Sequence, residues 1–157
     1  LEKYKVFHCP GDTRSTIMNR GYRSVSIIGT MRGEGGDSQP GYVKKLNEIY
    51  SAGSKIVFIE NVDPRGWNMG SWIMGNVTAA QPNWIDPLAV FHNDRSTLGF
   101  ADGHAEKRTW RDKSTVEMSR LAVEVGDNQC FNYPIQWGQG EGEDVQFVAR
   151  GYLAGGS

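Results

Sequence analysis

The residue types best able to do chemistry gather in one short segment of this chain. Segment 91–104 holds two of the three histidines, His92 and His104, together with Asp94 and Asp102. Imidazole and carboxylate groups are ligands for metal ions. The two histidines are separated by a turn, however, and their spacing matches no zinc motif such as His-Glu-x-x-His. We therefore expect His92 to fix a loop through hydrogen bonds and Asp102 to serve a turn.

Calcium is a second candidate ligand, because carboxylate oxygens occur in two places. Asp94 and Asp102 lie in the histidine segment, and further carboxylates lie in 141–144. A calcium ion needs six to eight oxygen ligands, which spacing alone does not establish. We expect no cofactor, with calcium as the alternative.

A nucleophilic hydrolase is a third possibility, because serines and a cysteine accompany the histidines. The candidate nucleophiles are Ser24, Ser26, Ser54 and Cys9. No Gly-x-Ser-x-Gly elbow is present. The local partner of Cys9 is His8, and adjacent residues in an extended chain point to opposite sides. We therefore expect a protein that is not an enzyme.

The Asp102-Gly103 pair lies between two strand-like runs, 97–101 and 104–110, and predicts a two-residue β-hairpin turn. Such a turn has positive φ at both of its residues. It predicts that Leu98, Phe100 and Ala105 face the core. The expected cross-strand pairs are Ala101–His104, Phe100–Ala105, Gly99–Glu106 and Leu98–Lys107.

The remaining patterns supply the elements around this hairpin. Segments 22–30 and 55–60 are rich in β-branched residues and predict strands, the second buried on both faces because it is almost continuously apolar. Apolar spacing predicts helical turns in 42–50 and helices over 114–125 and 144–153, the first with a Ser114–Glu117 capping box and an end at Gly126. Together these elements indicate one α+β domain, a small antiparallel sheet with short helices, over residues 1–157.

Tryptophans are prominent in segment 63–87, which is long and mostly irregular. Trp67, Trp72 and Trp84 lie there among Gly, Asn and Pro, and Trp137 lies further on. Exposed tryptophans can stack on sugars, so a glycan-binding surface is one interpretation. Packing of the tryptophans into a small apolar cluster is the other, and we favour it.

Composition limits the possible partners. The 157 residues carry a net charge of −1, and no basic stripe occurs, so nucleic acid is not an expected partner. No apolar run of about 18 residues occurs that would cross a membrane. The two cysteines, Cys9 and Cys130, could pair if the protein is exported, or remain two free thiols.

Several separated segments resemble one bacterial family. His92, followed after nine residues by Asp102-Gly103, resembles the H-x9-DG domain that follows prepilin-type N-termini, chiefly in planctomycetes and their relatives. The run 100–104, which ends in His104, is similar to the Phe-x-Asp-Gly-His core of that motif. Segments 55–60 and 144–152 resemble the central strand and a C-terminal segment of the same family.

The N-terminal region carries a further part of this resemblance. Cys9, Pro10 and Asp12 are similar to the Cys-Pro-x-Asp element upstream in the family. The resemblance implies a pilin-like head, in which an N-terminal helical spine packs on a small antiparallel sheet. The spine and its membrane anchor would precede Leu1. Export, which the resemblance implies, favours a Cys9–Cys130 disulfide.

The resemblance also implies a role. We expect a non-enzymatic structural subunit, the pseudopilin-like head of a type II secretion or type IV pilus-like filament. Its partners would be copies of itself, other pilin-like subunits and a secreted cargo. It would be exported to the periplasm or cell surface, anchored in the inner membrane only through the missing N-terminal helix. A cell-surface module that binds glycans or calcium is the alternative.

Overall fold

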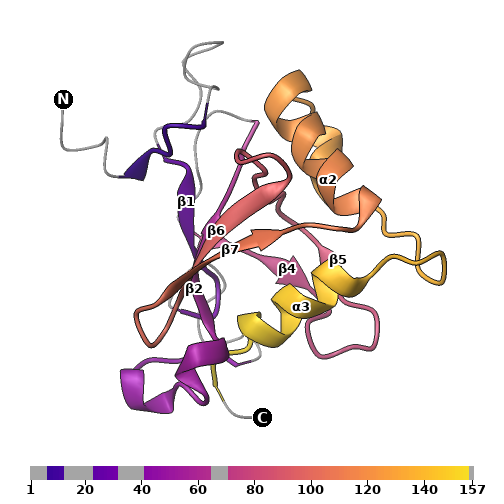
Figure 1. Ribbon diagram of the computed structural model, residues 1–157. Coiled ribbons are helices and arrows are strands. Elements are labelled where there is room, and N and C mark those ends of the chain that lie inside the picture. The colour runs from indigo at the N-terminus through magenta and orange to yellow at the C-terminus, as the bar shows by residue number, and fades with distance from the viewer. Residues whose placement is uncertain (1–6, 13–22, 32–40, 65–70, 156–157) are drawn as a thin grey trace.

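A five-stranded mixed sheet forms the centre of the computed structural model, which describes residues 7–12, 23–31, 41–64 and 71–155 (Figure 1). The strand order is β3-β1-β2-β6-β7. The strands are β1 (Val25–Ile28), β2 (Ile56–Glu60), β3 (Ser71–Trp72), β6 (Arg95–Phe100) and β7 (Ala105–Thr109). A separate two-stranded sheet pairs β4 (Met74–Gly75) with β5 (Asn83–Trp84). The α+β class is confirmed, but the main sheet is not wholly antiparallel, because β3 pairs with β1 in parallel.

Two α-helices lie on the same side of the main sheet (Figure 1). Helix α2 (Lys113–Arg120) continues as a π-helix (η5, Leu121–Val125), and α3 (Glu143–Tyr152) follows near the C-terminus. Short 3₁₀-helices are η3 (Leu46–Glu48), η4 (Ala52–Ser54) and η6 (Asn128–Cys130). None of the described helices has the length and apolar character needed to cross a bilayer. The structure does not test the expected N-terminal helical spine, because the described part of the chain begins at residue 7.

The predicted helices are present, with local differences. In α3 the predicted apolar stripe is buried, and Gly126 ends η5 in the left-handed region with φ +70°. The Ser114–Glu117 capping box is absent, because Asp112 occupies the N-cap position. Of the helical turns predicted over 42–50, only the three-residue 3₁₀-helix η3 is present, and its Leu46 is 85% exposed.

Alternate residues of the strands point to the two faces of the sheet. On the inner face, Ile28, Ile59 and Leu98 are fully buried together with Trp72 and Trp84, which confirms that these tryptophans pack in the core. Trp67 lies outside the described residues.

The outer face of the sheet is more open than the sequence predicts. Phe58 is 49% exposed, and Ile27 and Val57 are half-buried. The apolar run of β2 indicated burial on both faces, and this prediction is wrong because both helices cover the same side. Phe58 lies across Gly99 of the neighbouring strand, where an added Cβ would be 3.4 Å from the Phe58 Cβ.

The β6–β7 hairpin is confirmed, but its register differs by one residue from the prediction. The Phe100 amide donates to the His104 carbonyl at 2.9 Å, and the Gly103 amide donates to the Phe100 carbonyl at 3.0 Å. The turn therefore contains three residues, a length for which a type I turn followed by one left-handed residue is common. Gly103 supplies that residue with φ +95°, whereas Asp102 is not in the positive-φ region. His104 consequently stacks on Phe100 with ring centroids 4.4 Å apart, and Ala105 is exposed.

We expect Gly103→Val to lower the free energy of unfolding by about 1–2 kcal/mol, because a β-branched residue is strained at this φ. No atom lies within 4 Å of an added Cβ, so the loss reports backbone strain and not a clash. Urea denaturation measures the change. Gly103→Asn is the matched control and should lose less, because Asn adopts positive φ more readily. A wild-type midpoint for Gly103→Val would contradict the turn.

Candidate functional site

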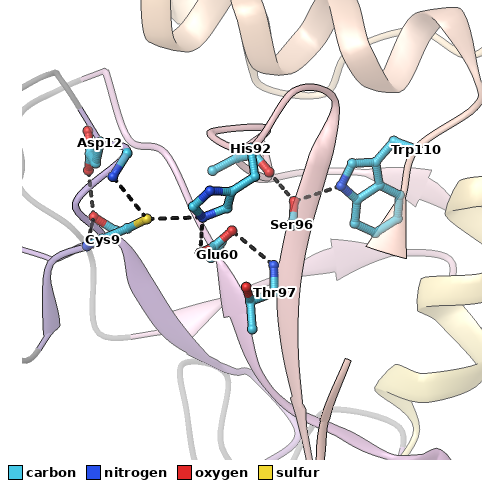
Figure 2. Close-up of polar contacts among 10 residues, drawn as sticks. Cys9, Asp12, Glu60, His92, Ser96, Thr97 and Trp110 are labelled. Atoms are coloured by element: carbon cyan, nitrogen blue, oxygen red, sulfur yellow. Dashed lines mark hydrogen bonds and ion pairs between the residues drawn. The ribbon is translucent and has the colours of Figure 1, made fainter. Parts of the chain in front are cut away.

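The side chain of His92 is directed by a tight turn just before β6. Asn93 and Asp94 both have φ +57°, the sign pattern of a type I′ turn, and the His92 amide donates to the Arg95 carbonyl at 3.4 Å. Asn and Asp are the non-glycine residues that tolerate this region best. Figure 2 shows the imidazole between Cys9 and the carboxylate of Glu60.

Cys9, Glu60 and His92 form the one group of potential metal ligands found among the described residues. The His92 Nε2 lies 3.2 Å from the Cys9 Sγ and 3.2 Å from the Glu60 Oε1. All three ligand atoms lie within 4.8 Å of one another. They come from three distant segments, namely the N-terminal turn, the end of β2 and the loop before β6, so the cluster is a product of the tertiary fold.

The N-terminal turn holds Cys9 against the sheet. The Asp12 amide donates to the Cys9 carbonyl at 2.9 Å, and Ser24 Oγ donates to Asp12 Oδ2 at 2.6 Å. The same Ser24 oxygen accepts the Cys9 amide at 2.9 Å. A Cβ on Gly11 would lie 3.3 Å from the His92 Cε1, so glycine allows the turn to approach the imidazole closely. Thus the predicted motif residues Cys9 and Asp12 lie in one turn, which the structure brings to His92.

Glu60 is the member of the cluster that sequence analysis did not identify. Glu60 is only 4% exposed, and its Oε2 accepts a hydrogen bond from the Thr97 amide of β6 at 2.9 Å. A carboxylate that directly follows an apolar run in a strand is the signal that the sequence offers, because a charge that becomes buried there needs partners. The strand position alone does not reveal that those partners are His92 and Cys9.

The electrostatics of this cluster disfavour a cysteine nucleophile. Burial raises the pKa of the Cys9 thiol, and the Glu60 carboxylate raises it further, so the thiol stays protonated at neutral pH. Moreover, one imidazole nitrogen, Nε2 of His92, contacts both the sulfur and the carboxylate. A Cys–His–acid relay uses the two ring nitrogens separately. The geometry therefore does not match a hydrolytic triad.

The other predicted site residues lie elsewhere. At the hairpin tip, beyond the opposite end of β6 from His92, His104 Nδ1 lies 2.5 Å from Asp102 Oδ1 and its Nε2 lies 3.3 Å from Glu106 Oε1. The backbone amide and the imidazole of His104 bond to Asp102 and lower the pKa of that carboxyl. In turn, the Asp102 hydrogen bond raises the pKa of the exposed His104. Asp94 pairs instead with Arg120 at 2.8 Å.

The carboxylates considered for calcium also have separate partners. Glu141 accepts the Ser114 and Gln136 amides, each at 3.1 Å, and Asp144 accepts amides at the start of α2. Asp94 and Asp102 bind the different partners described above. Glu143 pairs with Arg111 at 3.7 Å, and these five carboxylates therefore do not converge on one point.

The cysteine pairing considered from the sequence is absent from the structure. Neither Cys9 nor Cys130 is part of a disulfide. Cys130 is fully buried at the end of η6, whereas the Cys9 sulfur lies against His92. Each sulfur is held by the packing of its own segment, which explains why they do not pair.

The chain was compared with known proteins at three levels. No protein-family model, no curated protein and no solved structure matches it.

Proposed function

We propose that this chain is a non-enzymatic structural subunit, the pseudopilin-like head of a type II secretion or type IV pilus-like filament. We further propose that it packs against neighbouring copies of itself or other pilin-like subunits through the outer face of its sheet. The H-x9-DG resemblance implies the class of assembly. It also implies that the protein is exported and is anchored in the inner membrane by a preceding helix. The observation that carries the contact is the apolar surface on the β1 and β2 part of that open face.

The outer face continues into an apolar groove of about 240 Å³. Ile27 belongs to both, since it pairs with Phe58 across the sheet and lines the groove. The other apolar residues that line the groove include Met31, Val43, Leu46, Ile49 and Val57. Lys44 and Lys45 also border it.

An open face of an antiparallel sheet is ordinarily polar, because it meets water. Here Phe58 is 49% exposed and Leu46 is 85% exposed, on a surface that also holds the groove. Contiguous exposed apolar surface favours contact with another protein. Lateral packing of sheet faces between subunits would bury it.

The glycan and calcium alternative gains no comparable support. Trp72 and Trp84 are fully buried, so neither ring has a face that a sugar could reach. Trp137 is half-buried, and its ring lies 2.4 Å from the position of a Cβ on Gly142.

A photo-crosslinking amino acid placed at Phe58 tests this function in the full-length protein in its own cells. Val125 is the control position, because it is 67% exposed but lies on η5, away from the outer face. We expect crosslinks from position 58, and not from 125, to a second copy or to another protein with a prepilin-type N-terminus. Mass spectrometry identifies the product. Crosslinks to neither class from position 58 would refute the proposal.

A further inference from the structure

We propose that Cys9, Glu60 and His92 bind one zinc ion through the thiolate sulfur, the imidazole Nε2 and a carboxylate oxygen, with water in a fourth position. Thiolate, imidazole and carboxylate together are a ligand set that zinc accepts, and three protein ligands plus water is a common arrangement. The site is independent of the proposed structural role.

The distances within the cluster fit a tetrahedral ion. Zinc bonds of ordinary length at tetrahedral angles separate sulfur from nitrogen by about 3.5 Å and nitrogen from oxygen by about 3.3 Å. The structure has 3.2 Å for both separations, and the sulfur and the carboxylate lie within 4.8 Å of each other. The two separations that involve His92 Nε2 therefore need to change by only a few tenths of an ångström, and the sulfur and the carboxylate are already close enough to share one ion.

Hydrogen bonding alone satisfies this cluster poorly. The Nε2 of His92 carries at most one proton, yet it contacts both the Cys9 sulfur and the Glu60 carboxylate. If Nε2 is protonated, it donates to one of them and has no lone pair to accept the Cys9 S–H; if it is not, it has no proton to donate to the Glu60 carboxylate. A cation placed between the three atoms attracts a lone pair from each of them. The convergence of three electron-pair donors is thus explained better by an ion than by hydrogen bonds.

Neighbouring groups hold the ligands in the orientation that binding requires. The Thr97 amide binds the second oxygen of Glu60 at 2.9 Å and leaves Oε1 directed at His92. The Gly11 amide lies 3.4 Å from the Cys9 sulfur as a donor, which favours the thiolate. Such supporting hydrogen bonds are a regular feature of protein metal sites.

The site is accessible to an ion from solution. The His92 side chain is 36% exposed, whereas that of Glu60 is 6% exposed. Binding exchanges the Cys9 S–H bond for a sulfur–zinc bond, and the proton passes to solvent. The Nε2 lone pair binds the metal, so neutral His92 carries its proton on Nδ1. The ion would then join segment 7–12 to β2 and to the loop before β6.

Zinc and cobalt titrations of the chelator-treated protein test this site. We expect zinc at about 100 times its Kd to raise Tm by about 5–10 °C. Cobalt should give a thiolate-to-metal charge-transfer absorption, a signal that a site without Cys9 does not produce. Cys9→Ser should abolish that absorption, and Cys9→Ser and His92→Gln should each weaken zinc binding by about 100-fold or more.

His104→Gln is the matched control, because His104 also lies beside two carboxylates and its side chain is about as exposed as that of His92, but it lies outside the cluster. It should leave zinc affinity unchanged. An equal loss in His104→Gln and His92→Gln would overturn the proposal, as would cobalt binding without charge transfer. Alkylation of Cys9 in the wild-type chain gives a measurement that needs no variant. Zinc should slow it, and an unchanged rate at saturating zinc would also overturn the site.

Discussion

Asp144→Ala should lower the free energy of unfolding by about 3–5 kcal/mol, the loss expected when one partner of a buried charged network is removed. The Asp144 side chain is fully buried. It accepts the amides of Arg111 at 2.7 Å and Asp112 at 2.8 Å, and the Arg108 guanidinium lies at 3.3 Å. Truncation leaves these donors without their charged acceptor. Urea denaturation at neutral pH measures the loss.

The contact is reciprocal, which is why one carboxylate has such a large effect. Asp112 is the N-cap of α2, but its side chain accepts the amides of Gly142 and Asp144, each at 2.9 Å, at the start of α3. Asp144 in turn accepts amides at the start of α2. Asp112 therefore caps the start of α3, while Asp144 binds the N-cap amide of α2 and the amide before it.

Glu143→Ala is the matched control for this prediction. Glu143 is the neighbouring acid in the same helical turn, but its side chain is 59% exposed and its ion pair with Arg111 spans 3.7 Å. Exposed pairs contribute at most about 1 kcal/mol. Similar losses in the two variants would contradict the reciprocal contact.

The sequence predicts the elements of this fold better than their pairing. Apolar periodicity correctly locates the strands 25–28 and 56–60 and the helix 143–152, because it depends on neighbouring residues alone. The two-residue strand β3 is too short for any period, so its parallel pairing with β1 is not predictable in this way. Exposure of Phe58 depends on where both helices pack, and no local pattern contains that information.

The turns show how local chemistry can be recognised and still misassigned. Asp102-Gly103 is compatible with a two-residue or a three-residue hairpin turn, and the choice shifts every cross-strand pair. The structure adopts the longer turn, in which only Gly103 has positive φ. The two adjacent positive-φ residues are Asn93 and Asp94. Asn-Asp is a weaker turn signal than Asp-Gly, although the turn at Asn93-Asp94 determines where the His92 side chain points.

The zinc candidate shows a different limit of sequence analysis. The sequence predicts that His92 fixes a loop and that Cys9 belongs to a motif, but the contact between them joins positions 83 residues apart. Sequence proximity instead indicated His8 as the partner of Cys9. Tertiary packing determined the actual partner, and it added Glu60 from the end of β2.

The second large effect concerns Trp72 in segment 63–87. The sequence allows two roles for the tryptophans of this segment, core packing and sugar binding. We expect Trp72→Ala to lower the free energy of unfolding by about 3–5 kcal/mol. Trp72 is fully buried, and its ring contacts Trp84 and Tyr152 edge-on, with centroids 6.0 and 6.1 Å away. Its indole Nε1 donates to the Pro87 carbonyl at 3.2 Å. Urea denaturation again provides the measurement.

Trp72→Phe separates packing from hydrogen bonding, because it keeps an aromatic ring and leaves the Pro87 carbonyl without its donor. It should lose less than Trp72→Ala, and Leu46→Ala, at an 85% exposed position, should change stability by about 0.5 kcal/mol or less. A change in stability as small as this for Trp72→Ala would contradict the packing of the indole in the core. Since Trp72 ends β3 and contacts α3 through Tyr152, a large loss would mean that this segment fastens the edge of the sheet to the helix behind it.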